Sequence, residues 1–127
     1  MCSSDLGLFS TALEADEIIT KVMFPLPKKA AYVKFRNQAS RYALVGVFVA
    51  RRPSDVRVAV TGAGSEGVFR VTAFEEALKK RFAAKALDGI EVPAEGLNSD
   101  IHGSAEYRAH LIGVLTRRAL DAANAKE

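Results

Sequence analysis

The spacing of apolar residues divides the chain into a first half of strands and a second half of helices. Residues 18–24 place Ile18, Val22 and Phe24 on one side of an extended chain, and this period of two predicts a strand. The two prolines that follow end it, because proline donates no hydrogen bond to a sheet. We therefore expect an N-terminal strand ahead of the main sheet.

Three more strands are predicted close together in the sequence. The first covers residues 31–36 and alternates between a polar and an apolar face. The second covers 44–50 and is apolar on both faces, which predicts a central strand covered on each side. The third covers 56–60 and follows a turn that contains proline. Neighbouring strands with short connections favour an antiparallel meander.

Beyond these strands the apolar period becomes helical. Thr72 and Glu75 have the spacing of a capping box, in which both side chains satisfy amide groups at a helix start. Residues 89–99 have the composition of a loop, and a last helix is predicted over 104–123, with arginines on its solvent side. Its buried stripe is expected to contain Tyr107, Leu111, Val114, Leu115 and Ala119. Strands followed by helices predict an α+β fold: a three-stranded antiparallel sheet, an N-terminal strand and packed C-terminal helices.

Composition narrows the classes of function. The 127 residues fit one domain, and 49% hydrophobic against 26% charged residues is an ordinary globular balance. No apolar run approaches the roughly 20 residues that span a bilayer, so we expect no membrane span and a cytoplasmic protein. The net charge of +3 comes from interspersed residues rather than a basic stripe with stacking aromatics, which disfavours nucleic-acid binding. One cysteine and two histidines form no metal-ligand pattern.

The first six residues differ in character from the rest. Residues 2–6 read like the translated end of a sequencing adapter. We therefore expect residues 1–6 to be a non-native leader, the natural reading frame to begin upstream, and Cys2 to carry no function. The expected domain covers residues 7–124, and a short tail follows at 125–127.

Residues 62–67 match the Gly-x-Gly-x-x-Gly pattern of dinucleotide-binding loops. That chemistry requires a helix to begin at the last glycine, so that its amide groups hold the pyrophosphate. Here the strand-like residues 68–71 precede any helix. A glycine-rich turn is therefore favoured over a nucleotide site.

The other polar residues suggest no self-contained catalytic arrangement. His102 and His110 lack the oriented partner that general-base catalysis needs, so a surface or capping role is favoured. Tyr32, Lys34 and Arg36 share one face of a strand, where a cation beside an aromatic could face a ring or an anion. From the period alone, a solvated sheet edge is the favoured interpretation.

Four stretches together resemble one family. They are residues 9–20, 39–47, 60–64 with 68–70, and 99–108 with 115–119. The last contains Ser99-Asp100-Ile101 and Ala105-Glu106-Tyr107-Arg108, a distinctive run. From about residue 7 to 123 the chain is similar to the C-terminal domain of the medium, flavin-binding subunit of carbon monoxide dehydrogenase and related xanthine dehydrogenase-family molybdenum hydroxylases. The resemblance implies a three-stranded antiparallel sheet with helices packed on it.

The resemblance also implies a function in electron transfer. In such enzymes a molybdenum subunit oxidises the substrate, and electrons pass through iron–sulfur clusters to FAD and then to an external acceptor. The implied partners are the N-terminal FAD-binding domains of the same subunit, the iron–sulfur subunit and the molybdenum subunit. The pyrophosphate-binding glycine motifs of the family lie in those N-terminal domains. This chain alone is therefore expected to be inactive and to bind FAD weakly or not at all.

The resemblance assigns cofactor-binding residues position by position. Ile18 and Ile19 match an apolar pair that lies against the flavin. Lys34 matches a strand lysine near the ring, and Tyr42 matches an aromatic beside it. The family often has Gly-Asp before this aromatic, whereas this chain has Ser40-Arg41, so the local charge changes from acidic to basic.

Two classes of function remain open at this point. The chain is either the flavin-covering domain of an electron-transfer subunit or a free-standing structural or interaction module without a cofactor. Glycine motifs encoded upstream would favour the first. The substrate would be selected by the molybdenum subunit, and the sequence specifies neither it nor the acceptor.

Overall fold

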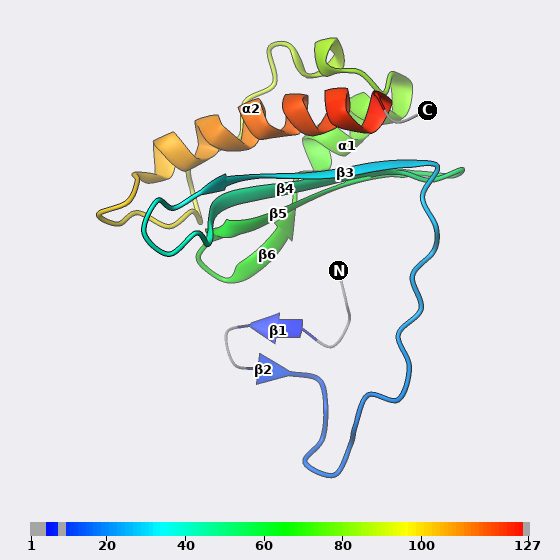
Figure 1. Ribbon diagram of the computed structural model, residues 1–127, viewed down its shortest axis with the longest axis vertical. Coiled ribbons are helices and arrows are strands. Elements are labelled where there is room, and N and C mark those ends of the chain that lie inside the picture. The colour runs from blue at the N-terminus through cyan, green and yellow to red at the C-terminus, as the bar shows by residue number, and fades with distance from the viewer. Residues whose placement is uncertain (1–4, 8–9, 126–127) are drawn as a thin grey trace.

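The computed structural model describes residues 5–7 and 10–125 (Figure 1). The elements are β1 Asp5–Gly7, β2 Ser10–Thr11, β3 Lys29–Arg36, β4 Ala43–Arg51, β5 Val56–Gly64, β6 Gly67–Arg70, α1 Thr72–Lys80, the 3₁₀ helix η1 Ala84–Leu87 and α2 Ala105–Asn124. A four-stranded antiparallel sheet has the order β3-β4-β5-β6, and the helices lie on one of its faces. This arrangement confirms the predicted α+β fold.

The short strands β1 and β2 pair with each other in a separate sheet. In Figure 1 they lie apart from the main sheet, on the side away from the helices, and an extended segment joins them to β3. Of the expected leader, residues 1–4 with Cys2 lie outside the described residues, whereas Asp5 and Leu6 belong to β1. Residues 126–127 of the expected tail also lie outside the described part.

The fourth strand of the main sheet is β6, and the strand predicted over 18–24 does not form. An alternating pattern makes a strand only where a neighbour satisfies its backbone groups. Residues 18–24 are extended without such a neighbour, and their large apolar side chains are exposed. β6 pairs with β5 because Gly67, with a φ of 103°, turns the chain straight back.

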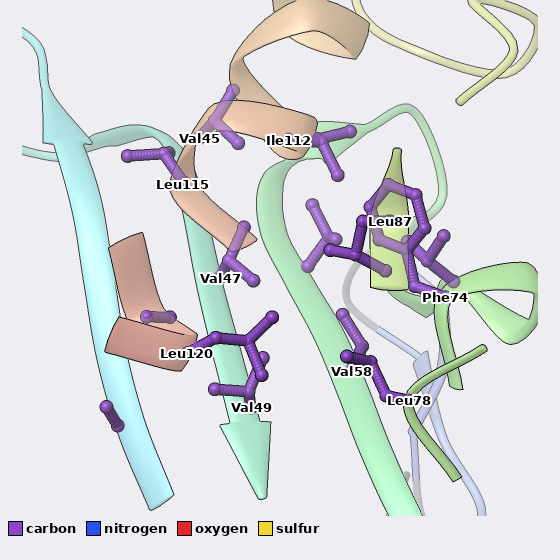
Figure 2. Packing of buried hydrophobic residues seen from close by; sticks show 14 of the residues in the cluster. Val45, Val47, Val49, Val58, Phe74, Leu78, Leu87, Ile112, Leu115 and Leu120 are labelled. Carbon is purple, nitrogen blue, oxygen red and sulfur yellow. The ribbon is translucent and has the colours of Figure 1, made fainter. Parts of the chain in front are cut away.

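The core lies between one face of the sheet and the helices. Val45, Val47 and Val49 alternate along β4 and are fully buried, and Val47 lies opposite Val33 on β3 and Val60 on β5. Figure 2 shows the helical side chains that pack over β4 and β5, which are Phe74, Leu78, Leu87, Ile112, Leu115 and Leu120. Burying each such side chain stabilises the fold by about 1.5–3 kcal/mol.

No helix packs on the other face of β4, where Gly46 and Ala50 are buried but Phe48 is not, so the predicted cover on both sides is only partial. Phe48 on this face is 39% exposed. Gly46 is buried because Tyr32 of β3 lies across it, with the tyrosine oxygen 3.3 Å from Thr61 Oγ1. A Cβ at Gly46 would meet that tyrosine oxygen at 2.3 Å. Residues 44–50 are therefore continuously apolar because one face of the strand packs in the core and Gly46 on the other face leaves room for the Tyr32 ring.

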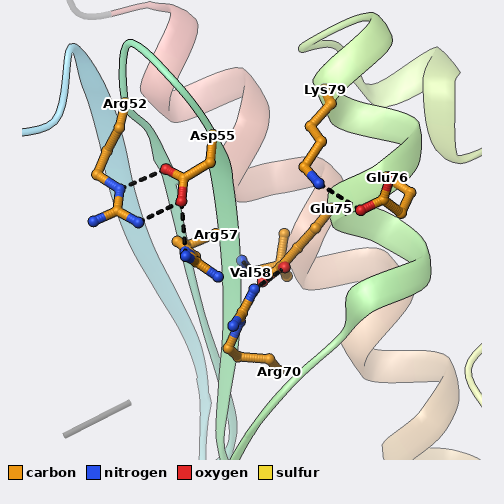
Figure 3. A network of polar contacts seen from close by, with 8 residues as sticks. All are labelled: Arg52, Asp55, Arg57, Val58, Arg70, Glu75, Glu76 and Lys79. Atoms are coloured by element: carbon orange, nitrogen blue, oxygen red, sulfur yellow. Dashed lines mark hydrogen bonds and ion pairs between the residues drawn. The ribbon is translucent and has the colours of Figure 1, made fainter.

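α1 begins without the predicted capping box. Val71 is the N-cap residue, and no side chain caps the helix. Glu75 is 3% exposed and accepts hydrogen bonds from the Val58 N–H and from Arg70 Nε, both at 2.9 Å (Figure 3). Burial alone would raise the pKa of Glu75, but the bonds from Arg70 and Val58 hold it below its usual range. The carboxylate thus replaces the strand acceptor that Val58 loses where β6 ends.

α2 begins as predicted, with Ser104 Oγ accepting the Tyr107 N–H at 3.2 Å. The stripe residues Leu111, Leu115 and Ala119 are buried and Val114 is half-buried. Two expectations for this helix were wrong. Tyr107 is 42% exposed, with its ring edge-on to Phe35, and Arg108 is buried instead of facing solvent.

Residues 62–67 cover the end of β5, a two-residue turn at Ser65 and Glu66, and the first residue of β6, so the predicted glycine-rich turn is present but shorter than the motif. Gly64 pairs with Gly67 across the hairpin, and no helix begins at the last glycine. Gly62 has a φ of 77° where the strand register shifts, and a Cβ there would lie 2.2 Å from the Ala43 carbonyl oxygen. The glycine is required by its backbone conformation and by the adjacent strand, not by a phosphate.

Candidate functional site at the end of the β3–β4 hairpin

The β3–β4 hairpin turns through residues 37–42 at one end of the sheet (Figure 1). The Asn37 N–H donates to the Tyr42 carbonyl at 2.8 Å, and the Arg41 N–H donates to the Asn37 carbonyl at 2.9 Å. Asn37 Oδ1 also accepts the N–H groups of Ala39 and Ser40, at 2.9 and 3.3 Å. One asparagine therefore organises the loop, as is common for this residue in turns.

Two of the predicted site residues lie together at this hairpin. Lys34 Nζ donates to the Arg41 carbonyl at 3.5 Å, which places the lysine beside the residue that precedes Tyr42. Tyr42 is 79% exposed and lies directly before β4. The hairpin end thus presents a cation and an aromatic ring to solvent.

The other two predicted site residues are not brought to the hairpin. Ile18 and Ile19 are 81% and 59% exposed and lie on the extended segment between β2 and β3. In Figure 1 this segment leaves β3 at its Lys29 end, away from the loop that follows Arg36. Their assignment beside a flavin stays a prediction.

Arg108 joins α2 to the sheet beneath the hairpin. Its side chain is 3% exposed. Nη1 donates to the Leu44 carbonyl at 2.8 Å and the Gly62 carbonyl at 3.2 Å, and Nε donates to the Gly103 carbonyl at 3.4 Å. Nη2 pairs with Asp100 Oδ2 at 2.8 Å. A single guanidinium therefore links β4, β5 and the loop before α2.

Asp100 balances the buried charge of Arg108. Its Oδ1 accepts the His102 N–H at 2.9 Å while its Oδ2 accepts from Arg108. The backbone N–H of His102 and, to a smaller degree, the guanidinium hold the pKa of Asp100 below its usual range against partial desolvation. Both carboxylate oxygens are thus engaged, and the group stays ionised at neutral pH.

A polar cleft of about 220 Å³ lies between the hairpin loop and the loop before α2. We call it the hairpin cleft; it is lined by Asn37, Ser40, Tyr42, Asp100, His102 and Arg108, with Ala43, Leu44 and Gly62. A larger cleft of about 480 Å³ lies between α2 and residues 89–94, and His110 lines it. Both histidines are exposed, in agreement with the expected surface role.

The buried role of Arg108 was missed at the level of sequence, although a signal for it exists. Arg108 precedes Leu111 by three residues and Ile112 by four, so the helical period places it on the buried face of α2. The left-handed backbone of Arg41, with a φ of 61°, has no comparable signal, because arginine rarely adopts it.

Metal-ligand clusters and membrane-spanning helices were both sought in the part of the chain that the structure describes. Across residues 5–7 and 10–125, histidine, cysteine and carboxylate side chains form no group of three or more that could hold a metal ion. In the same residues, no helix combines the length and apolar character needed to cross a membrane.

Comparisons with known proteins agree with the fold and with the four stretches of sequence that resemble the flavin-binding subunits. Residues 30–123 match the model of the CO dehydrogenase flavoprotein C-terminal domain. The chain is 39% identical to the nicotine 6-hydroxylase medium subunit of Paenarthrobacter nicotinovorans, over 95% of this chain and 46% of the relative. It is 29% identical to the carbon monoxide dehydrogenase medium chains of Afipia carboxidovorans and Hydrogenophaga pseudoflava, over 94% and 95% of this chain and 46% of each relative.

The chain therefore spans about half the length of these curated relatives. No solved structure matches it at a significant level. The matched residues 30–123 contain nearly all of the main sheet, both helices and the hairpin cleft. The chain belongs to the CO dehydrogenase flavoprotein C-terminal domain family.

Proposed function

We propose that this chain forms the flavin-covering domain of the FAD subunit of a molybdenum hydroxylase. The observation that carries the proposal is the family match over residues 30–123. When bound, FAD would supply the transfer of electrons from iron–sulfur clusters to an external acceptor. The proposed partners are the N-terminal FAD-binding part of the same subunit, the iron–sulfur subunit and the molybdenum subunit. The names of the relatives as medium subunits support this assembly.

The exposed end of the hairpin is chemically suited to a flavin ring. The ring of Tyr42 can lie along an aromatic system and exclude water from it. Lys34 can stabilise negative charge at the polar edge of the ring, because a cation in a partly desolvated site interacts more strongly than in water. Neither side chain has to move far to contact a flavin. Tyr42 is largely exposed, and Lys34 would lose only its long hydrogen bond of 3.5 Å to the Arg41 carbonyl.

The segment before β3 supports assembly with further protein. Its large apolar side chains Ile18, Ile19, Val22, Met23, Phe24 and Leu26 are all exposed. So many exposed large apolar side chains along one segment are typical of a site that another polypeptide or a ligand covers. In the proposed subunit, the FAD-binding part covers this segment, and Ile18 and Ile19 lie against the flavin.

The proposal is tested in the assembled enzyme that contains this chain. Lys34→Met keeps the apolar stem and removes the charge, so the flavin reduction potential should fall by some tens of millivolts. About 59 mV corresponds to a tenfold change in a one-electron equilibrium, so such a shift is measurable. Tyr42→Leu should change turnover with the electron acceptor more than oxidation of the substrate, which reacts at another subunit. Lys28→Met, directly before β3 at the end away from the hairpin, is the matched control and should change neither.

The potential is measured by spectroscopic titration, and the two half-reactions by stopped flow. If both variants match the unmodified enzyme in potential and in acceptor rate, the assignment of Lys34 and Tyr42 is wrong. If the purified assembly contains no flavin, the proposed function itself is wrong and a module without a cofactor is favoured.

A further inference from the structure

We propose that the hairpin cleft binds an oxyanion group, a phosphate or a carboxylate, of a small-molecule ligand. The cleft lies between residues 37–42 and 100–108, which Arg108 joins through its bonds to Leu44 and Asp100. These contacts are made within the chain itself, so the cleft forms without a cofactor. The inference does not require the proposed role beside a flavin, although Tyr42 belongs to both sites.

The lining of the hairpin cleft is rich in donors that have capacity to spare. Asn37 uses its Oδ1 inside the loop, which leaves its amide NH₂ group for a ligand. Of the five guanidinium N–H groups of Arg108, four make the bonds described above, and one on Nη2 remains. His102 and Tyr42 add an imidazole and a hydroxyl. Asp100 is paired with Arg108, so most of the uncommitted polar groups of the lining are donors, which favours a ligand group that accepts hydrogen bonds.

The charges around the cleft also favour an anion. Arg41 lies in the hairpin loop between the lining residues Ser40 and Tyr42, and Lys34 donates a hydrogen bond to its carbonyl, so two cationic residues belong to the hairpin that forms one wall of the cleft. Asp100 is the one carboxylate that lines the cleft, and Arg108 neutralises it. Arg41 keeps a left-handed backbone that glycine or asparagine would adopt more easily. Compared with glycine or asparagine at this position, Arg41 therefore adds a positive charge to the loop but no backbone preference for this conformation.

The size of the cleft defines how much of a ligand it holds. Pockets that enclose drug-sized ligands have volumes of about 300–1,000 Å³. The hairpin cleft, at about 220 Å³, is too small for a nucleotide or a flavin but admits a single oxyanion group. The rest of the ligand would then extend past the exposed ring of Tyr42.

The test is an NMR titration of the ¹⁵N-labelled chain with inorganic phosphate, acetate and ADP, each at an ionic strength matched with sodium chloride. We expect saturable shifts of the Asn37 and His102 amides and of Arg108 Nε, with a dissociation constant in the millimolar range. A preference for phosphate or acetate identifies the oxyanion class. Tighter binding of ADP with the same shifts would identify the anion as part of a nucleotide.

Two variants separate binding from folding. His102→Ala should weaken phosphate binding roughly threefold to tenfold, the effect of one hydrogen bond, whereas His110→Ala, the other exposed histidine, should bind normally. Arg41→Gly should also weaken binding while raising the urea midpoint, because it removes a flanking charge and relieves the left-handed backbone. Equal binding by the His102 variant, or shifts that sodium chloride alone reproduces, would overturn the proposal.

Discussion

Substituting Glu75 tests whether its buried carboxylate joins α1 to the sheet instead of capping the helix. Glu75→Ala leaves the buried Val58 N–H without an acceptor and Arg70 without its partner. An unsatisfied buried amide costs about 1–3 kcal/mol, and a broken buried ion pair about 3–5 kcal/mol. The Arg70 side chain is 34% exposed and can regain water, which reduces the second cost. We therefore expect the free energy of unfolding to fall by about 2–4 kcal/mol.

The charge of Glu75 also predicts a pH dependence. Glu75→Gln keeps an acceptor for Val58 but removes the charge that Arg70 pairs with. Because the pKa of Glu75 is lowered in the folded state, the charge contributes its full stability above the unfolded pKa of about 4.3. That contribution is lost as the pH falls through the lower folded pKa. The stability difference between the unmodified chain and the glutamine variant should thus be constant near neutrality and shrink under acidic conditions.

Urea unfolding followed by circular dichroism from pH 7 downwards measures both effects. Glu76→Ala is the matched control, because Glu76 is 69% exposed and pairs with Lys79 on the surface of the same helix. Its removal should change the free energy of unfolding by no more than about 0.5 kcal/mol. If Glu75→Ala costs no more than Glu76→Ala, or if the stability difference of the glutamine variant stays constant at low pH, the Glu75 carboxylate does not join α1 to the sheet.

Three further outcomes are expected. Gly62→Ala should cost about 2–4 kcal/mol in urea unfolding and Gly96→Ala about 1 kcal/mol, because both have positive φ but only Gly62 would also place a Cβ against backbone. Equal costs would contradict this. Arg108→Gln should cost about 3–5 kcal/mol by the same assay, whereas Arg118→Gln, on the exposed side of α2, should stay within about 0.5 kcal/mol. The chain alone should retain no stoichiometric FAD after gel filtration, as judged by absorbance at the flavin bands; a bound yellow chromophore would contradict that expectation.

The elements that could be predicted from the sequence are those whose partners lie close along the chain. Residues 31–36 and 56–60 alternate, residues 44–50 are continuously apolar, and all three pair through hairpins, so the local pattern agrees with the tertiary pairing. The start of α2 depends on a hydrogen bond within one turn, from Tyr107 to Ser104. Residues 18–24 show the same alternation without a pairing neighbour, and they form no strand.

Buried charges could not be predicted in the same way, because they depend on where other elements end. A threonine and a glutamate three residues apart suit a helix cap, yet Glu75 turns to the sheet because β6 stops and leaves the Val58 N–H unpaired. Arg108 lies on the apolar stripe of α2, and its position is made favourable by the Asp100 carboxylate and by carbonyl groups of Leu44 and Gly62, which lie far away in the sequence.

The candidate site also has a part that the sequence predicts and a part that depends on tertiary contacts. The strand period placed Lys34 on an outward face, and the resemblance pointed to Tyr42, but the cleft between them and α2 depends on contacts that no local pattern encodes. Within the loop, the hydrogen bonds of Asn37 define the backbone path, and the Arg41 side chain takes no part in them. The charge at that position can therefore change from acidic to basic while the sheet and the loop keep their shape. Residue 41 is thus able to alter which ligand the hairpin attracts without altering the fold that holds it.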